Sequence, residues 1–350
     1  MTSSPPEGAH YVGSGPAPAT PPSRARRRAR IAALAVALAA GLVGALAALA
    51  DLAWWLELFA HFRPQYALAL LASGAALVAL RARAAGVAAL LLAAVNALPL
   101  LHYYHPRPPP GPPGPELRAV LANVWYRNAD PGRLLAWLRE SPPDVAVLLE
   151  VTPQWRAAIA ALADVLPYQA HSAGVLVASR RPLGALRAVE FEGEDEGALV
   201  FTTELAGVPV TVIGAHASWP LGAVVAARRG AQLETLAGLA REAPGPVLLL
   251  GDLNLTAFSP HFARLLAGGN LADCAAGRGF VPSWPVSFPP LGLRIDHCLH
   301  GPGLAPAVLR NGPRIGSDHY PLEVTLRAAT AARGPAGGLR SGSALPTSRR

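Results

Sequence analysis

Three long apolar segments near the N-terminus constrain the fold of this chain more than any other feature. Residues 31–50 are 20 consecutive uncharged residues, and a helix of that length can cross the hydrocarbon core of a bilayer. Two further apolar runs, 64–80 and 84–101, are separated only by a short Arg-Ala-Arg turn. A cleaved signal peptide would account for the first run alone. The three runs together favour three transmembrane helices over 31–101.

Arginines at the ends of these runs predict their orientation. Five Arg residues stand at 24–30, before the first run, and two more stand at 81–83. Because membrane-flanking loops rich in Arg remain in the cytoplasm, we expect both segments there. An odd number of spans then places the chain after residue 101 outside the cytoplasm. The sequence therefore predicts a multi-pass protein of the cell (inner or plasma) membrane, in direct contact with the lipid bilayer.

The remaining chain divides by composition into two tails, a linker and one globular domain. Residues 1–30 are basic and lack apolar periodicity, and 328–350 are rich in Ala, Gly, Ser and Arg, so we expect both tails to be disordered. The Pro/Gly-rich linker 102–115 is expected to hold the next domain off the membrane. That domain, 116–327, has 17 Arg against 19 acidic residues, so the net charge of +8 of the whole chain does not indicate a nucleic-acid-binding surface.

Apolar and amphipathic segments alternate within the domain and predict an α/β fold. The predicted strands are 117–125, 144–151, 174–179, 198–205, 209–217, 246–254, 294–300 and 321–327, and the predicted helices are 130–140, 152–166 and 224–242. The last helix is expected to carry Arg228 and Arg229 on its surface. Cys274 and Cys298 allow either one disulfide or two buried thiols.

Polar side chains recur where the predicted strands end. They are Asn123, Glu150, His216, Asp252, Asn254, Asp296, Asp318 and His319. Each alone could simply form a turn, but together they lie where layered α/β folds bind their ligands. At 251–254, Gly251 would allow a tight turn. The alternation of side chains along a strand then points Asp252 and Asn254 to the same face.

The types of these side chains fit one chemistry. Carboxylates and amides without cysteine ligands favour a hard cation, Mg²⁺ or Mn²⁺. A metal ion can neutralise a phosphate and polarise its oxygen, and histidines nearby can donate protons or stabilise charge on a phosphoryl oxygen. The set is therefore typical of metal-assisted phosphoester hydrolysis.

In order and spacing, these residues resemble the endonuclease/exonuclease/phosphatase superfamily. The motifs Gly-Asp-Leu-Asn at 251–254 and Gly-Ser-Asp-His at 316–319 carry the resemblance, which covers 117–327. The segments most similar to the bacterial membrane-anchored branch, which has N-terminal transmembrane helices, are 148–155, 229–233 and 283–285. The resemblance implies a four-layer α/β sandwich, two packed β-sheets flanked by helices, as an extracytoplasmic catalytic domain at 116–327 preceded by about three transmembrane helices.

The resemblance also implies which residues hold the metal. Glu150 would be the main metal ligand, and Asn123 would lie beside it, on the metal or the phosphate. Asp318 would assist at the metal or near His319. The implied cofactor is Mg²⁺ or Mn²⁺.

The catalytic roles follow from the same resemblance. Asp252 would position or deprotonate the attacking water, and Asn254 would orient that water. His319, with its tautomer fixed by Asp296, would bind the phosphoryl oxygen. His216 would donate to the phosphate or to the leaving group.

We therefore expect a membrane-anchored, divalent-metal-dependent hydrolase that directs water onto phosphorus, with a lipid-linked or small phosphoester as substrate. The alternative is an extracytoplasmic endonuclease or exonuclease. Nucleic acid is the less favoured substrate because the domain is near neutral and because His297 stands where many nucleases of the family carry an aromatic residue. The intact polar set argues against a non-enzymatic membrane module, and no obligate protein partner is evident.

Overall fold

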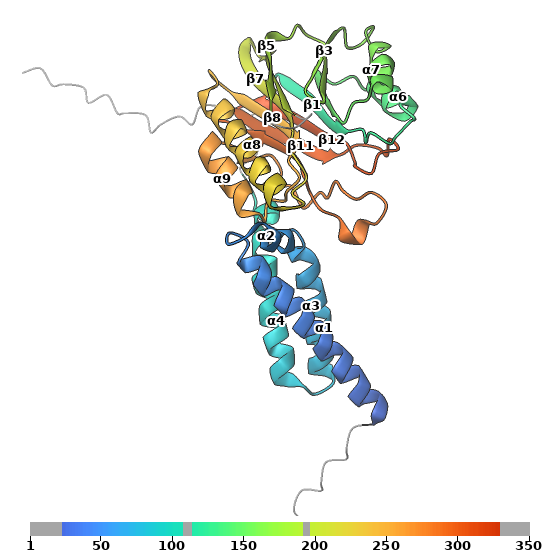
Figure 1. The fold of residues 1–350 in the computed structure, drawn as a ribbon, viewed down its shortest axis with the longest axis vertical. Coiled ribbons are helices and arrows are strands. Elements are labelled where there is room, and N and C mark those ends of the chain that lie inside the picture. Colours follow the sequence, from blue (N-terminus) through green and yellow to red (C-terminus); the bar gives the residue numbers. More distant parts are fainter. Residues whose placement is uncertain (1–22, 108–113, 192–196, 330–350) are drawn as a thin grey trace, which may run out of the picture.

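The computed structural model describes residues 23–107, 114–191 and 197–329, which form a helical stem below an α/β domain (Figure 1). The expected tails, apart from 23–30 and 328–329, and the middle of the expected linker lie outside the described residues.

The stem consists of the helices between residues 24 and 104. They are α1 (Arg24–Ala48), α2 (Trp54–Ala60), α3 (Arg63–Ala79), α4 (Arg83–Ala97), the 3-10 turn η1 (Leu98–Leu100) and α5 (Leu101–Tyr104). Helices α3 and α4 cross closely because glycines meet there. A Cβ on Gly86 would lie 2.9 Å from the backbone oxygen of Gly74, and small residues of this kind let helix backbones approach in membranes.

Two helical segments of the described chain, Arg24–Ala48 and Arg83–Tyr104, are long and apolar enough to cross a membrane. Between them in sequence lies α3, which has 17 residues. The outward faces of the three long helices remain apolar: Leu38, Leu68 and Leu91 are each at least 64% exposed. Such a surface is unusual for a helix bundle in water.

The α/β domain contains two six-stranded sheets. The first has the order β11-β12-β1-β2-β4-β3 and the second β5-β6-β7-β8-β10-β9. The strands are β1 (Glu116–Asn123), β2 (Val145–Leu149), β3 (Tyr168–Ser172), β4 (Val175–Ser179), β5 (Gly184–Glu190), β6 (Gly197–Leu205), β7 (Val208–His216), β8 (Val247–Asp252), β9 (Ala272–Asp273), β10 (Asp296–His300), β11 (Leu304–Asn311) and β12 (Leu322–Ala328). Both sheets are mixed: β1–β2 and β7–β8 pair in parallel, and the other named pairs are antiparallel.

Helices cover the outer face of each sheet, so the domain has four layers. Inward-facing side chains such as Val147, Phe201 and Val212 form the core between the sheets. The helices α6 (Gly132–Glu140) and α7 (Pro153–Ala160) pack on the first sheet. The helices α8 (Ala223–Glu242) and α9 (Pro260–Gly269) pack on the second sheet. The predicted α/β sandwich of two sheets flanked by helices is confirmed.

The domain rests directly on the stem, in contrast to the spacing expected from the linker. Helix α2 contacts α8, and Tyr103 of α5 is fully buried in the core between the sheets. The backbone N–H of Gly279 donates to the carbonyl of Tyr103 at 2.7 Å. The start of the expected linker is therefore part of the packed domain.

A disulfide joins Cys274 to Cys298, with the two Cα atoms 5.4 Å apart. The alternatives that the sequence left open are thus decided in favour of one bridge, which ties β10 to the turn after β9.

Candidate active site

Strand pairing gathers most of the predicted residues at one end of the two sheets. In the first sheet, Asn123 ends β1 and Glu150 directly follows the parallel strand β2. In the second sheet, His216 and Asp252 end the parallel strands β7 and β8 and lie opposite each other in register. Asp296 begins the antiparallel strand β10 opposite Asp252. Since parallel strands end at the same edge, the polar residues of both sheets converge there.

The loop that precedes β12 brings the last two residues, Asp318 and His319. The Ser317 hydroxyl donates to the backbone oxygen of Asn123 at 2.8 Å and accepts from the His319 backbone N–H at 3.0 Å. This small hydrogen-bonding motif fastens the loop to the end of β1.

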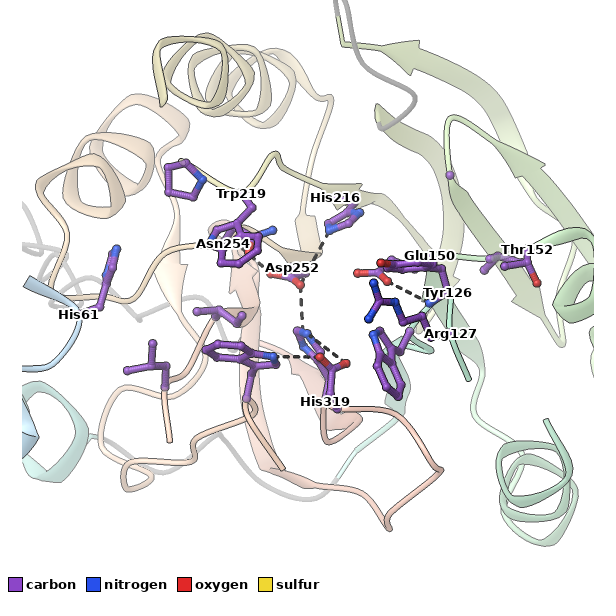
Figure 2. Close-up of a pocket in the computed structure, with 18 of the residues that line it drawn as sticks. His61, Tyr126, Arg127, Glu150, Thr152, His216, Trp219, Asp252, Asn254 and His319 are labelled. Atoms are coloured by element: carbon purple, nitrogen blue, oxygen red, sulfur yellow. Dashed lines mark hydrogen bonds and ion pairs between the residues drawn. The ribbon is translucent and has the colours of Figure 1, made fainter. Parts of the chain in front are cut away.

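These residues surround a cavity of about 740 Å³ (Figure 2). Six of the eight predicted residues line it: Glu150, His216, Asp252, Asn254, Asp318 and His319. Asn123 and Asp296 are almost fully buried. Asn123 hydrogen-bonds to Glu150 and Asp252, and Asp296 hydrogen-bonds to His319. The structure therefore brings all eight predicted residues together at this site.

The amide of Asn123 connects carboxylates of the two sheets. Its Nδ2 donates to Glu150 Oε1 at 2.7 Å and to Asp252 Oδ2 at 3.1 Å. The second oxygen of Glu150 accepts from the backbone N–H of Tyr126 at 3.0 Å. Glu150 also has a positive φ of 58°, a conformation that costs energy and is often found at functional sites.

Asp252 and Asn254 share the cavity for a different reason than simple strand alternation. The strand ends at Asp252, and Asn254 adopts a left-handed conformation with φ 50°. The backbone N–H of Asn254 donates to Asp252 Oδ1 at 3.0 Å, and its Nδ2 donates to the Ala217 carbonyl at 2.8 Å. Gly251 lies within the strand, where a Cβ would meet the Ala215 oxygen at 2.6 Å. Gly251 is thus required for close packing and does not form the turn that we expected.

His319 is paired with Asp296, as the resemblance implied. The distance from His319 Nδ1 to Asp296 Oδ2 is 2.8 Å, and from the same nitrogen to Asp252 Oδ2 it is 3.8 Å. Burial by itself lowers the pKa of His319, but Asp296, with support from Asp252 and Asp318, raises it to about 10. The ring is therefore protonated at neutral pH, and its Nε2–H is available to an anionic ligand.

The two buried aspartates titrate differently. Burial, followed by the charge of Asp296, raises the pKa of Asp252 to about 6, although His319 and His216 oppose this shift. Burial also tends to raise the pKa of Asp296, but the contact with His319 outweighs it and lowers that pKa. Asp252 is therefore the carboxylate that can exchange a proton near neutral pH.

The donor set fits a divalent cation. Within the described residues, potential ligand atoms of Asp252, Asp296 and His319 lie within 4.8 Å of one another. The buried oxygens Asp296 Oδ1 and Asp318 Oδ1 have no hydrogen-bond partner, which is costly unless another group binds them. Carboxylate oxygens are ligands that Mg²⁺ and Mn²⁺ prefer, whereas His319 could bind a cation only with a neutral ring. Glu150, the predicted main ligand, lies in the same cavity but is not part of this cluster.

The sequence did not reveal several residues of the cavity wall. Leu58 and His61 come from the stem, about two hundred residues before the Asp252 motif, and line the same cavity. Trp219 and Trp284 also line it, and Trp284 Nε1 donates to Asp318 Oδ2 at 3.1 Å. The Trp219 side chain, which forms part of this wall, is 62% exposed.

Two sequence expectations are corrected here. Arg229 is fully buried, although the helix pattern placed it on the surface of α8. His297 faces away from the cavity: it is buried, its Nε2 bonds to the Leu255 carbonyl at 2.8 Å, and its ring packs on Phe262. The identity of residue 297 therefore says nothing about the substrate.

Comparisons with known proteins agree with this geometry. The sequence profile of the Endonuclease/Exonuclease/phosphatase family matches residues 120–319. No curated protein matches the chain.

Similar solved structures include an endonuclease/exonuclease/phosphatase from Beutenbergia cavernae, with 23% identity, coverage of 62% of this chain and 72% of that chain, and a TM-score of 0.51. A humanized D. rerio TDP2 has 18% identity, coverage of 61% and 99%, and a TM-score of 0.52. Sphingomyelinase C from Streptomyces griseocarneus has 22% identity, coverage of 62% and 100%, and a TM-score of 0.48. At these identities the likeness concerns the fold. With the family profile spanning more than half of the chain, we conclude that this protein belongs to the endonuclease/exonuclease/phosphatase family and is a phosphohydrolase.

Proposed function

We propose that the protein is a multi-pass, membrane-anchored and Mg²⁺- or Mn²⁺-dependent phosphohydrolase of the bacterial membrane-anchored branch. Its proposed substrate is a lipid-linked or other amphiphilic phosphoester. The observation that carries the proposal is the place of the cavity: strand-end residues of both sheets line it together with Leu58 and His61 of the stem.

The stem supports a membrane anchor with α1, α3 and α4 as three spans. Two segments have sufficient length and hydropathy, and the 17 residues of α3 correspond to about 25 Å of helix, close to the thickness of the hydrocarbon core. The arginines at 24–30 and 81–83 lie at the end of the stem away from the domain (Figure 1). This charge distribution supports the proposal that the α/β domain lies outside the cytoplasm.

Exposed apolar side chains, which we call the apolar rim, lie in segments next to the junction between the stem and the domain. Gln65, the third residue of α3, donates to the Gly292 carbonyl at 3.3 Å, so the loop around η2 (Pro289–Leu291) lies against the top of the stem. In that loop Phe288 is 54% exposed, and at the start of the α8 segment Val224 is 66% exposed. Apolar side chains at the level where membrane helices emerge favour a substrate that resides in the lipid interface.

The residues of the site support hydrolysis by water. A divalent cation held by Glu150 and Asn123, with Asp318 nearby, would neutralise charge on the phosphate and polarise it. His319 is protonated, so we assign it to donation rather than to metal ligation, which needs a neutral ring. Asp252 accepts a proton from water.

The remaining predicted groups act on His319 and Asp252 or beside them. Asp296 holds Nδ1–H of His319, which leaves Nε2–H to bind a phosphoryl oxygen. Asn254 fixes the carboxylate of Asp252 through its backbone N–H and borders the water. We assign His216 to donation to the phosphate or the leaving group.

A DNA phosphodiester is the alternative substrate. One similar D. rerio TDP2 structure contains a single-strand DNA product. The near-neutral charge of the domain and the apolar rim favour the lipid interface over a polyanion.

The substrate class is tested with the full chain in lipid nanodiscs and Mg²⁺. Phosphate or headgroup release from phospholipid and lipid-pyrophosphate vesicles is compared with cleavage of single- and double-stranded DNA, each with a D252A control. We expect D252A-sensitive release from lipid only. D252A-sensitive cutting of DNA without lipid hydrolysis would overturn the proposed substrate.

A further inference from the structure

A buried ion pair connects the stem to the catalytic domain. Glu57 on α2 is 1% exposed, and Arg229 on α8 is fully buried. Nη2 of Arg229 donates to Glu57 Oε2, and the Ser259 hydroxyl donates to Glu57 Oε1. The Glu57 carboxylate of the stem is therefore buried against the domain, where Arg229 and Ser259 donate to it.

The same guanidinium reaches the catalytic loop. Nη1 of Arg229 donates to the backbone oxygen of Asn254 at 2.9 Å. Asn254 has a left-handed backbone, a conformation that glycine favours and that asparagine also adopts. Hydrogen bonds support this conformation. One support is the bond from its side chain to the Ala217 carbonyl, and the other is Arg229. Through Asn254 N–H, this backbone in turn fixes the Asp252 carboxylate.

The ion pair depends on both members. Burial tends to raise the pKa of Glu57, but Arg229, Ser259 and the neighbouring His61 and His261 outweigh it and lower that pKa. Glu57 is thus ionised at neutral pH. Removal of either partner would leave an uncompensated buried charge, which proteins avoid at the cost of local rearrangement.

We propose that Glu57 and Arg229 are positioning residues: the stem supplies the carboxylate that fixes Arg229, and Arg229 fixes the Asn254 backbone beside Asp252. The active site is complete only when α2 is docked on α8. The membrane stem is then a structural part of the catalytic centre as well as an anchor.

The test compares three variants of the full chain in detergent or nanodiscs. E57Q removes the charge from the stem. E57L/R229M removes the whole pair without leaving a buried charge, so it recovers the thermal stability that E57Q loses. D51N is the matched control, because Asp51 also links the stem to the domain, through Arg264 at 2.8 Å, but this pair is exposed.

The first readout is hydrolysis of a soluble chromogenic phosphodiester with Mg²⁺, and it alone rests on the proposed function. We expect roughly 10- to 100-fold lower kcat, with little change in KM, for both E57Q and E57L/R229M, as for small displacements of catalytic groups. D51N should match the wild type. A double variant with wild-type kcat would show that the pair only stabilises the fold, and would overturn the proposal.

The second readout needs no activity. Hydrogen–deuterium exchange of peptides covering 251–257 should accelerate in E57Q and in E57L/R229M but not in D51N. Unchanged exchange in E57Q and in E57L/R229M would overturn the coupling between the stem and the catalytic loop. If E57Q does not fold, the exchange of E57L/R229M alone decides the question. A wild-type chain that hydrolyses nothing would contradict the proposed function, whereas the exchange result would still test this inference.

Discussion

One amide bridges the carboxylates of the two sheets: Asn123 Nδ2 donates both to Glu150, which follows a strand of the first sheet, and to Asp252, which ends a strand of the second. The two sheets are therefore joined by these hydrogen bonds as well as by the packing of their inner faces. The bond also keeps two negative side chains at a fixed separation, which an apolar residue at 123 could not do.

Replacement of Asn123 by Asp tests this bridge. The new carboxylate cannot donate and adds a like charge, which should raise the pKa of Asp252 further. We expect kcat/KM at pH 7 to fall about tenfold or more, with the acid limb of the pH–rate profile moved to higher pH. Steady-state kinetics from pH 5 to 9 measure both. An unchanged profile for N123D would contradict the bridging role.

Glu150 is expected to bind the cation. E150Q should lose Mg²⁺ affinity and activity together, since a neutral amide is a much weaker ligand for a hard cation. Calorimetric titration with Mg²⁺ and kinetics on the same preparation measure the two losses. E204Q, which alters an exposed carboxylate of β6, is the matched control. Wild-type Mg²⁺ affinity in E150Q would assign the metal to other residues.

The pH dependence of hydrolysis follows from two shifted groups. Asp252 must be deprotonated to accept a proton, so the rate should fall as pH drops through about 6. His319 must be protonated to donate, so the rate should fall only as pH rises through about 10. A broad bell between these values is expected in the pH dependence of kcat/KM.

His319→Ala should remove the alkaline limb of that bell. The loss of a donor to the phosphoryl oxygen should lower kcat by about 100-fold or more, while Mg²⁺ affinity is retained. H171A changes an exposed histidine of β3 and should leave both unchanged. Full turnover in H319A would mean that the role of His319 is assigned wrongly.

His297 gives the fold a dependence on pH that is separate from catalysis. Burial, with the charge of Arg294, lowers its pKa to about 3, whereas in the unfolded chain it is about 6.5. Between these values the unfolded chain binds a proton that the folded chain does not. The free energy of unfolding should therefore fall on acidification below pH 6.5, by up to about 1.4 kcal/mol per pH unit from this residue.

Thermal unfolding at pH 7 and pH 5 measures this effect. His297→Leu removes the titrating ring, so the difference between the two pH values should be smaller in H297L than in the wild type. An equal difference in both chains would show that His297 does not contribute.

The apolar rim should matter only for substrates held in a membrane. Phe288→Ser should slow hydrolysis of lipid in vesicles by a few-fold to about tenfold, in line with the loss of one buried aromatic contact, and leave a soluble phosphodiester unaffected. V208S, at the start of β7 and far from the cavity, is the control. Equal effects of F288S on both substrates would argue against contact with lipid.

Sequence reasoning located the site because strand ends carry a strong local signal. The runs before Asn123, Glu150 and Asp252 are apolar and end abruptly in polar residues. Parallel pairing brings Asn123 next to Glu150 in the first sheet and Asp252 next to His216 in the second, and the packing of the two sheets brings these pairs together. Strand β5 was missed because its side chains are mostly exposed and show no apolar alternation. Helix α9 was missed although Ser259 and Pro260 form a clear start signal.

The contacts between the stem and the domain had no sequence signal at all. Glu57 is one acidic residue in the segment between two apolar runs, and Arg229 was expected on the surface of a helix. Their pairing across 172 positions depends on how α2 docks against α8, which is a property of tertiary packing and not of local pattern.

The most direct test of the central claim is hydrolysis of a chromogenic phosphodiester by the full chain, measured for wild type and D252N with Mg²⁺ and after chelation. The account predicts turnover by the wild type with Mg²⁺, none after chelation, and a rate about 100-fold or more lower in D252N. A rate that survives both chelation and the loss of the Asp252 carboxylate would contradict a metal-dependent hydrolase at this site.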